Sequence, residues 1–271
     1  MKRIHFPFLS GKLGVSYTIS AVIMTACTII LVIVASVYAY QVLEQQRGAT
    51  EFNTAKKSVL AFNDAFENTA WKPKAVQSAR FTLNYGQLEL MPCTDPLIVN
   101  VSVGAFSNTT QYSTGLVRYS TKTKYANFGE GYKSYILGDE SLLVTGSMES
   151  YGRALIAQSW DCVNITLGYR VRAMRTSVIN VTGILVNYVD IWIIKVVIRA
   201  HSFYIGDFDL KAKCLNVTTY TPPQCPIELP VPVNCTVSVR FGSETPSSAP
   251  IALVAGEVVF NFVVAEVQVT L

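Results

Sequence analysis

The chain has 271 residues, and only 15% of them are charged, against about 25% in typical soluble domains. Its net charge of +4 comes mostly from three basic residues near the N-terminus, Lys2, Arg3 and Lys12. Because no other cluster of lysine and arginine stands out, nothing in the composition indicates nucleic-acid binding.

Residues 13–43 contain no charged side chain and follow directly on this basic leader. An apolar stretch of about 20 residues is enough to cross a bilayer as a helix. The positive charge of the leader favours its retention in the cytoplasm, so the rest of the chain is expected to be exported.

Three interpretations of this segment compete. A secretory signal peptide could end at Val37-Tyr38-Ala39, but its apolar region normally spans only about 7 to 15 residues, and this run is longer. A plain N-terminal anchor would remain in the membrane uncut. A prepilin-type signal would be cut between Gly14 and Val15, on the cytoplasmic side, and the exported protein would keep the whole apolar segment.

The run GVSYTISAVIMTA, which starts at Gly14, resembles the beginning of archaeal type IV pilins and pilin-like proteins. Those proteins carry a basic leader, a small residue, a Val-Ser or Ile-Ser pair and then a long apolar helix. The resemblance covers about residues 12–45, and it departs from the family pattern at Leu13 and Tyr17. Bacterial pilins have glutamate at the fifth mature position, where this chain has Ile19, so the archaeal form fits better.

The resemblance implies a leader over residues 1–14, processing at Gly14 and Val15 by a prepilin peptidase, and assembly by pilus machinery. It further implies a homopolymer whose apolar helices leave the membrane and form the core of an extracellular surface filament. The implied assembly positions are Val22, Ile29, Val32 and Tyr40. The implied role is structural and adhesive.

Beyond the apolar run, the spacing of Ala49, Phe52, Ala55, Val59, Phe62 and Phe66 places one apolar stripe on a helix. Polar residues, among them Glu51, are assigned to the other faces. Pro73 is expected to end the helix, because the residue before a proline is biased away from helical geometry. The sequence therefore predicts one helix over residues 15–72.

From Arg80 onward the pattern is β, with turn residues about every ten positions. Asn84-Tyr85-Gly86-Gln87 reads as the turn of a hairpin. The apolar stretch 178–198 is interrupted by polar residues and rich in β-branched ones, so strands are favoured over a second membrane helix. The predicted class is α+β: the long helix, then an antiparallel β-sandwich-like head over residues 73–271. The proline-rich loop 221–233 could subdivide this head, which is expected to fold alone from about Lys74.

Exported cysteines tend to pair, and five of the six cysteines lie beyond the apolar segment. A bridge between Cys214 and Cys225 is favoured, and Cys93, Cys162 and Cys235 are the other candidates. Six N-x-S/T sequons predict a glycosylated exterior surface, and they begin at Asn100, Asn108, Asn164, Asn180, Asn216 and Asn234.

No set of nucleophile, base and acid is recognisable, and no cysteine or histidine pair has the spacing of metal ligands, so neither an enzyme nor a metal or cofactor site is predicted. Two hypotheses remain. The first is a subunit of a pilus-like filament, located in the membrane before assembly. The alternative is a membrane-anchored, monomeric extracellular binding protein for sugars or other solutes.

Overall fold

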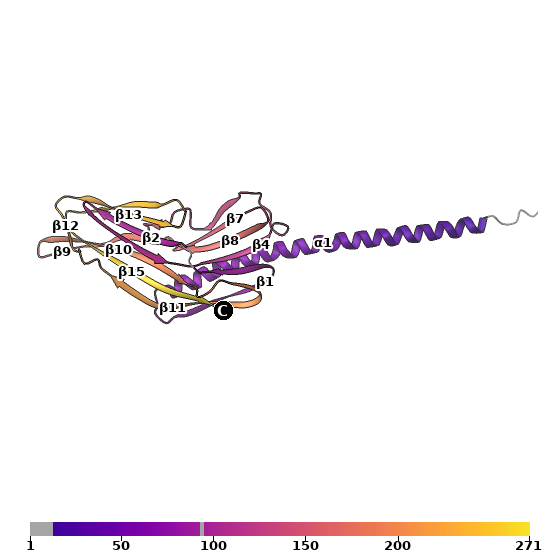
Figure 1. The fold of residues 1–271 in the computed structure, drawn as a ribbon, viewed down its shortest axis with the longest axis horizontal. Helices are drawn as coiled ribbons and strands as arrows, with labels where there is room; N and C mark the ends of the chain where they lie inside the picture. The colour runs from indigo at the N-terminus through magenta and orange to yellow at the C-terminus, as the bar shows by residue number, and fades with distance from the viewer. Residues whose placement is uncertain (1–12, 93–94) are drawn as a thin grey trace, which may run out of the picture. The chain divides into compact units, whose positions relative to one another are not determined.

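The computed structural model describes residues 13–92 and 95–271, with side chains from Ile19 onward. It has one long N-terminal helix followed by a mostly β domain, which confirms the α+β class (Figure 1). The chain forms two compact units, Met1–Arg47 and Gly48–Leu271. The expected ranges 15–72 and 73–271 placed this boundary elsewhere, because the second half of the helix belongs to the same unit as the strands. Residues 1–12 of the predicted leader 1–14, and Cys93, lie outside the described residues.

Helix α1 spans Leu13–Ala70, close to the predicted range. The amide of Lys72 donates to the carbonyl of Thr69 at 3.0 Å, which closes a turn before Pro73. Lys74 then adopts a positive φ of 69°, so the chain reverses immediately after the proline. The helix end therefore lies where proline chemistry places it.

An eleven-stranded sheet, sheet A, makes up most of the second unit and forms a half-barrel. Ten of its strands follow the order β5-β7-β8-β4-β1-β11-β15-β10-β9-β6, and β12 pairs with β15 off this path. The bounds are β1 Val76–Met91, β4 Leu116–Lys122, β5 Lys133–Leu137, β6 Leu143–Val144, β7 Gly152–Gln158, β8 Cys162–Tyr169, β9 Val171–Val181, β10 Ile184–Val197, β11 Ser202–Tyr220, β12 Ile227–Leu229 and β15 Gly256–Thr270.

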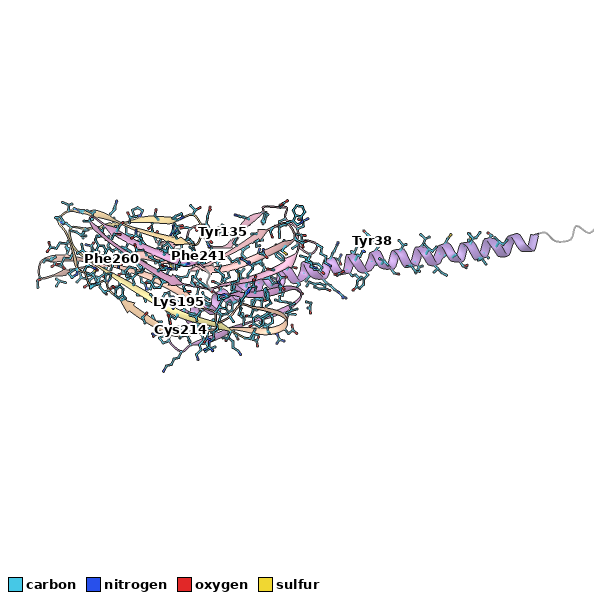
Figure 2. All side chains as sticks on the ribbon, in the orientation of Figure 1. Tyr38, Tyr135, Lys195, Cys214, Phe241 and Phe260 are labelled. Carbon is cyan, nitrogen blue, oxygen red and sulfur yellow. The ribbon has the colours of Figure 1, made fainter. Side chains whose placement is uncertain are left out.

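A four-stranded sheet, sheet B, has the order β14-β13-β2-β3. Its strands are β2 Pro96–Val103, β3 Phe106–Ser113, β13 Val233–Phe241 and β14 Ser247–Leu253. Apolar side chains of β2, β13 and β14 share a buried cluster with those of β10 and β15 from sheet A, and the rings of Phe106 and Phe260 stack at 5.7 Å (Figure 2 labels Phe260). One core therefore lies between the two sheets.

Two details of the expected head were wrong. Strands β10 and β15 pair in parallel over twelve residues, from Val186↔Glu257 to Val197↔Gln268, so the sheet is mixed rather than antiparallel. The expected hairpin at Asn84–Gln87 is a local irregularity inside the single long strand β1. In the loop 221–233, β12 adds to β15 and the compact unit continues across it. The stretch 178–198 does form strands, as expected.

The second half of α1 fills the other core, inside the half-barrel. Phe62, Phe66 and Ala70 are completely buried there, together with Phe52, Ala55 and Val59. They share this cluster with buried residues of β1, β4, β7, β8, β10, β11 and β15. Burial of one large apolar side chain is worth about 1.5–3 kcal/mol. A fragment beginning at Lys74 would lack all six side chains, so the structure favours an independent head that starts near Gly48 over one that starts at Lys74.

Glu51 contradicts its expected place on the polar side of the helix, because it is only 8% exposed. Its carboxylate accepts hydrogen bonds from three consecutive amides of the β1 irregularity: Asn84 at 2.6 Å, Tyr85 at 2.9 and 3.0 Å, and Gly86 at 2.8 Å. These amides are available because β1 leaves its register with β11 at this point. A buried charge held by several donors is stabilised, whereas one without donors is costly.

Gly86 and Tyr119 complete this contact. A Cβ on Gly86 would lie 2.4 Å from the Tyr119 hydroxyl oxygen, so a larger residue would have to displace the ring. Burial, followed by the negative charge of Glu51, raises the pKa of Tyr119, which is itself completely buried. The phenol therefore stays neutral beside the carboxylate over the physiological pH range.

Glu67 makes a second polar contact from the same helix. One of its oxygens accepts from the Ser150 hydroxyl at 2.5 Å and from the Gly152 amide at 2.8 Å. Gly152 lies so close to the helix that a Cβ there would be 2.0 Å from Asn63 Oδ1. Glu51 and Glu67 thus fix the register of the helix segment 48–70 at two separate points, which an apolar stripe alone does not define.

We expect Glu51→Ala to lower the free energy of unfolding of the β domain by about 2–4 kcal/mol, because three amides lose their shared acceptor. The matched control is Asp64→Ala, which removes an exposed acid from the same helix and should change stability by less than about 0.5 kcal/mol. Chemical denaturation of the purified full chain, followed by tryptophan fluorescence, measures both. Equal stability of the two variants would contradict the role assigned to Glu51.

Candidate functional site

The apolar part of α1 presents its side chains outward along its whole described length. The structure contains one helix long and apolar enough to span a membrane, and its apolar window is entirely unburied within the described chain. The four expected assembly positions are all well exposed, at 66% for Val22, 59% for Ile29 and Val32, and 68% for Tyr40. Figure 2 shows Tyr38 projecting from this part of the helix.

Hydroxyl groups in this segment are satisfied inside the helix. Thr25 donates to the carbonyl of Ala21 at 3.0 Å, Thr28 to Met24 at 2.8 Å, and Ser36 to Val32 at 2.7 Å. Such back-bonding removes the need for water or for a polar partner. The segment can therefore lie in lipid or against other helices without leaving these hydroxyls unpaired.

The processing site predicted at Gly14 and Val15 lies at the start of α1, and the leader before it is outside the described residues. Its cleavage stays a prediction.

Ionisable residues form no recognisable catalytic or metal centre in the described part of the chain. Within residues 13–92 and 95–271, no group of three or more His, Cys, Asp and Glu side chains could hold a metal ion. His201 lies beside Glu89, with Nε2 2.6 Å from a carboxylate oxygen, at the surface of the β1–β11 pair. This arrangement is that of a surface ion pair.

The favoured Cys214–Cys225 bridge is not formed, and both residues are free thiols. Cys214 is buried beside the end of α1, and its Sγ donates to the carbonyl of Ala70 at 3.2 Å (Figure 2). Cys214 pairs with Val267 of β15, whereas Cys225 lies next to Phe260 of the same strand. Seven positions of a strand amount to roughly 23 Å, far beyond the reach of a disulfide. A short separation in sequence did not imply proximity, because β11 runs away from Cys214 along β15.

The remaining described cysteines, Cys162 and Cys235, are also free thiols, and Cys93 lies outside the described residues. Cys235 is completely buried between the sheets, and this burial raises the pKa of its thiol to about 12. A thiol that stays protonated at neutral pH is a poor nucleophile, so Cys235 is a packing residue.

The six sequons differ in accessibility. Asn180, Asn216 and Asn234 are exposed, and Asn180 lies next to the β9–β10 turn. Asn100, Asn108 and Asn164 are half-buried on strands. The side-chain oxygen of Asn100 accepts from Ser107 and Thr109, and that of Asn164 accepts from Ser120 at 2.7 Å.

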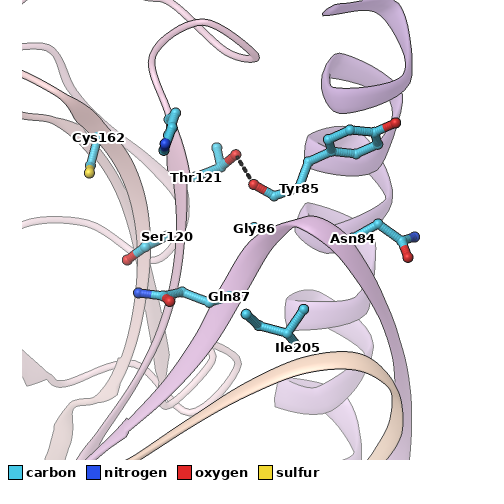
Figure 3. A pocket seen from close by; sticks show the side chains of 9 residues that line it. Asn84, Tyr85, Gly86, Gln87, Ser120, Thr121, Cys162 and Ile205 are labelled. Carbon is cyan, nitrogen blue, oxygen red and sulfur yellow. Dashed lines mark hydrogen bonds between the residues drawn. The ribbon is translucent and has the colours of Figure 1, made fainter. Parts of the chain in front are cut away.

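A hollow of about 230 Å³ opens where β1, β4 and β8 approach one another (Figure 3). Thr121 donates to the carbonyl of Tyr85 at 3.3 Å on its wall, while Gln87 and Ser120 present polar groups and Ile205 an apolar one. The lining has hydrogen-bonding groups but no cluster of charges, so it fits a small uncharged molecule better than an ion. Nothing in the sequence marked this hollow, because its residues come from strands far apart along the chain.

Comparisons with protein-family models, with curated proteins and with solved structures give no match to this chain. The geometry described above therefore carries the functional argument.

We expect glycans at Asn180, Asn216 and Asn234 in preference to Asn100, Asn108 and Asn164, because only the first three present an exposed side chain to a transferase acting on the folded protein. Mass spectrometry of peptides from the native protein measures site occupancy directly. Higher occupancy at Asn164 than at Asn180 would show that modification precedes folding or ignores exposure.

Proposed function

We propose that this protein is a subunit of an archaeal pilus-like surface filament, assembled through the apolar half of α1 and used for adhesion. The observation that carries the proposal is a run of exposed apolar side chains, from Ile19 to Leu43, with no charge among them. The resemblance of residues 12–45 to archaeal pilins supports the same assignment.

The free-energy cost of exposing these apolar side chains to water means that lipid or protein has to cover them. Removing one Leu or Ile side chain from water is worth about 1.5–3 kcal/mol, so many exposed ones together cannot persist in an aqueous exterior. Lipid covers them before assembly, and neighbouring copies of the helix would cover them in a filament. Small residues in the run, among them Ala21, Ala26 and Ala35, permit close approach between helices.

The second unit would form the surface of the filament. We propose a sandwich-like character for its part in which sheet B packs on β10 and β15, supported by their shared core. The partners implied are further copies of the chain, a prepilin peptidase and the assembly machinery, with location in the membrane and then outside the cell.

An anchored monomeric binding protein is the second candidate, favoured by the polar hollows in the β domain. In that case the apolar helix would remain in lipid permanently. Electron microscopy of surface filaments, with mass spectrometry of their subunit, separates the two: this chain should be found in the filaments.

We expect the mature protein to begin at Val15, because Gly14 lies between the basic leader and the apolar run. N-terminal peptide mapping of native protein decides this. A start at Tyr40 would instead identify a conventional signal peptide, remove the apolar helix from the mature chain and overturn the filament proposal.

We expect Val32→Asp to abolish filaments. A central Asp costs about 2.5–3.5 kcal/mol on membrane insertion, and the penalty would recur in every subunit of a helical core. The control is Val231→Asp, the same change at a position of the β domain that is 57% exposed, which should leave assembly intact. Filament yield is counted by electron microscopy. Normal filaments from Val32→Asp would show that this segment is not the assembly core.

A further inference from the structure

One face of the strands β1, β4, β8, β7 and β5 is turned away from the helix and carries mostly polar side chains. Alternate residues of these strands, such as Tyr119, Ile165 and Ile156, are buried against α1. The residues between them point the other way and are only partly covered. Strand pairing aligns them in rows, and we call this surface the outer face.

The first row crosses all five strands in register. It runs from Lys133 through Ala157, Asn164 and Ser120 to Gln87. Ala157 and Ser120 are short, whereas Lys133 and Gln87 at the ends are long. The surface along this row is therefore a depression, bordered at its two ends by the longer side chains.

The second row is formed by the residues two positions away from the first row on each of the five strands. It runs from Tyr135 through Leu155, Thr166 and Arg118 to Glu89. Beside it, Gly168 of β8 pairs with Arg153 of β7, and because glycine has no side chain the surface is low at this position.

Two adjoining hollows occupy this outer face. One, of about 310 Å³, is lined by Arg118, Asn164, Thr166 and Gly168. The other, of about 550 Å³, lies over Tyr135 and Lys133 and is closed by the loop that joins β13 to β14 through Glu244. Arg153 and Leu155 line both. Ligand sites have volumes of about 300–1,000 Å³, so the space suits a molecule of a few rings.

The two arginines at the hollows are paired within the chain, and two further residues of opposite charge, Lys133 and Glu140, line the larger hollow. Arg153 binds Glu244 through two parallel hydrogen bonds of 2.7 Å. Arg118 lies 3.7 Å from Glu89, and its buried Nε has no hydrogen-bond partner among the described residues. Paired charges offer no net field to attract an ion, yet their remaining N–H groups and oxygen lone pairs can still donate and accept.

Tyr135 and Leu155 add an apolar patch at the β5 edge of this polar surface, directly opposite each other on β5 and β7. Tyr135 is half-buried, so part of its ring remains accessible to a ligand. Sugars have the complementary surface, since their hydroxyl groups both donate and accept while their C–H faces pack on aromatic rings.

We propose that the outer face binds a neutral oligosaccharide, with Tyr135 beneath one sugar ring and with Arg118, Asn164 and Arg153 bonded to hydroxyl groups. An anionic ligand would have to displace Glu244 from Arg153, and an apolar ligand would leave the polar lining unpaired. The inference concerns the β domain alone and does not depend on filament assembly.

The test uses the full chain in nanodiscs, probed with an array of short neutral oligosaccharides of glucose, galactose, mannose and N-acetylglucosamine and with their sulfated forms. We expect a neutral member to bind, Ala157→Trp to abolish binding by filling the floor, and Tyr135→Ala to weaken it by about tenfold or more. The matched controls are Ala252→Trp and Tyr220→Ala, at exposed positions elsewhere on the β domain, which should bind as the wild type does.

Four results would overturn the proposal. The first is that no neutral oligosaccharide binds the wild type. The second is that Ala157→Trp and Ala252→Trp bind equally. The third is that only sulfated forms bind and that salt releases them. The fourth is a glycan attached to Asn164 itself, since the chain's own sugar would then fill the hollow. Each result leaves the filament proposal unaffected, because electron microscopy tests that separately.

Discussion

The β domain depends on burying one face of a helix segment inside a curved sheet. Residues 48–70 place Phe52, Val59, Phe62 and Phe66 within the half-barrel, in one cluster with buried residues of seven strands. Without that segment the concave face of sheet A would be open to water, and the sheet could not keep its curvature around an empty space. Two carboxylates of this segment, the buried Glu51 and the half-buried Glu67, fix how it is oriented within the sheet. Each is bonded to backbone amides, which sit at fixed positions in the sheet.

Much of the architecture could be predicted from local patterns. The uncharged run and the apolar stripe define α1, and Pro73 defines its end, because helix formation depends on near neighbours in sequence. Strands with clean alternation, such as β2 and β13, carry the same kind of local signal. In contrast, β3 has the polar sequence FSNTTQYS and carries no apolar signal, because its stability comes from pairing with β2 rather than from its own composition.

The remaining features depend on contacts between residues distant in sequence. The parallel pairing of β10 with β15 and the irregularity of β1 leave no local signal, so a hairpin and an antiparallel sheet were the natural expectations. Glu51 did carry a signal, since it lies four residues before Ala55 and eight before Val59, on the face that became buried. Its charge led to its assignment to the solvent side. The predicted Cys214–Cys225 bridge was wrong for the same reason as the predicted topology. The number of residues between two cysteines does not determine how far apart the strands place them.

Side chains alternate between the two faces of each strand, so the residues that stabilise the β domain differ from the residues that are exposed on its surface. On β4, Val117 and Tyr119 pack on the helix side, while Arg118 and Ser120 belong to the outer face. Substitutions of the outward residues leave the inward contacts in place, so the outer face can change its chemistry at little cost in stability. The apolar half of α1 is a separate compact unit and shares none of these residues. The proposed assembly through the helix and the proposed recognition through the outer face would therefore be under separate physical constraints, so a change of binding target would not require a change in how subunits assemble.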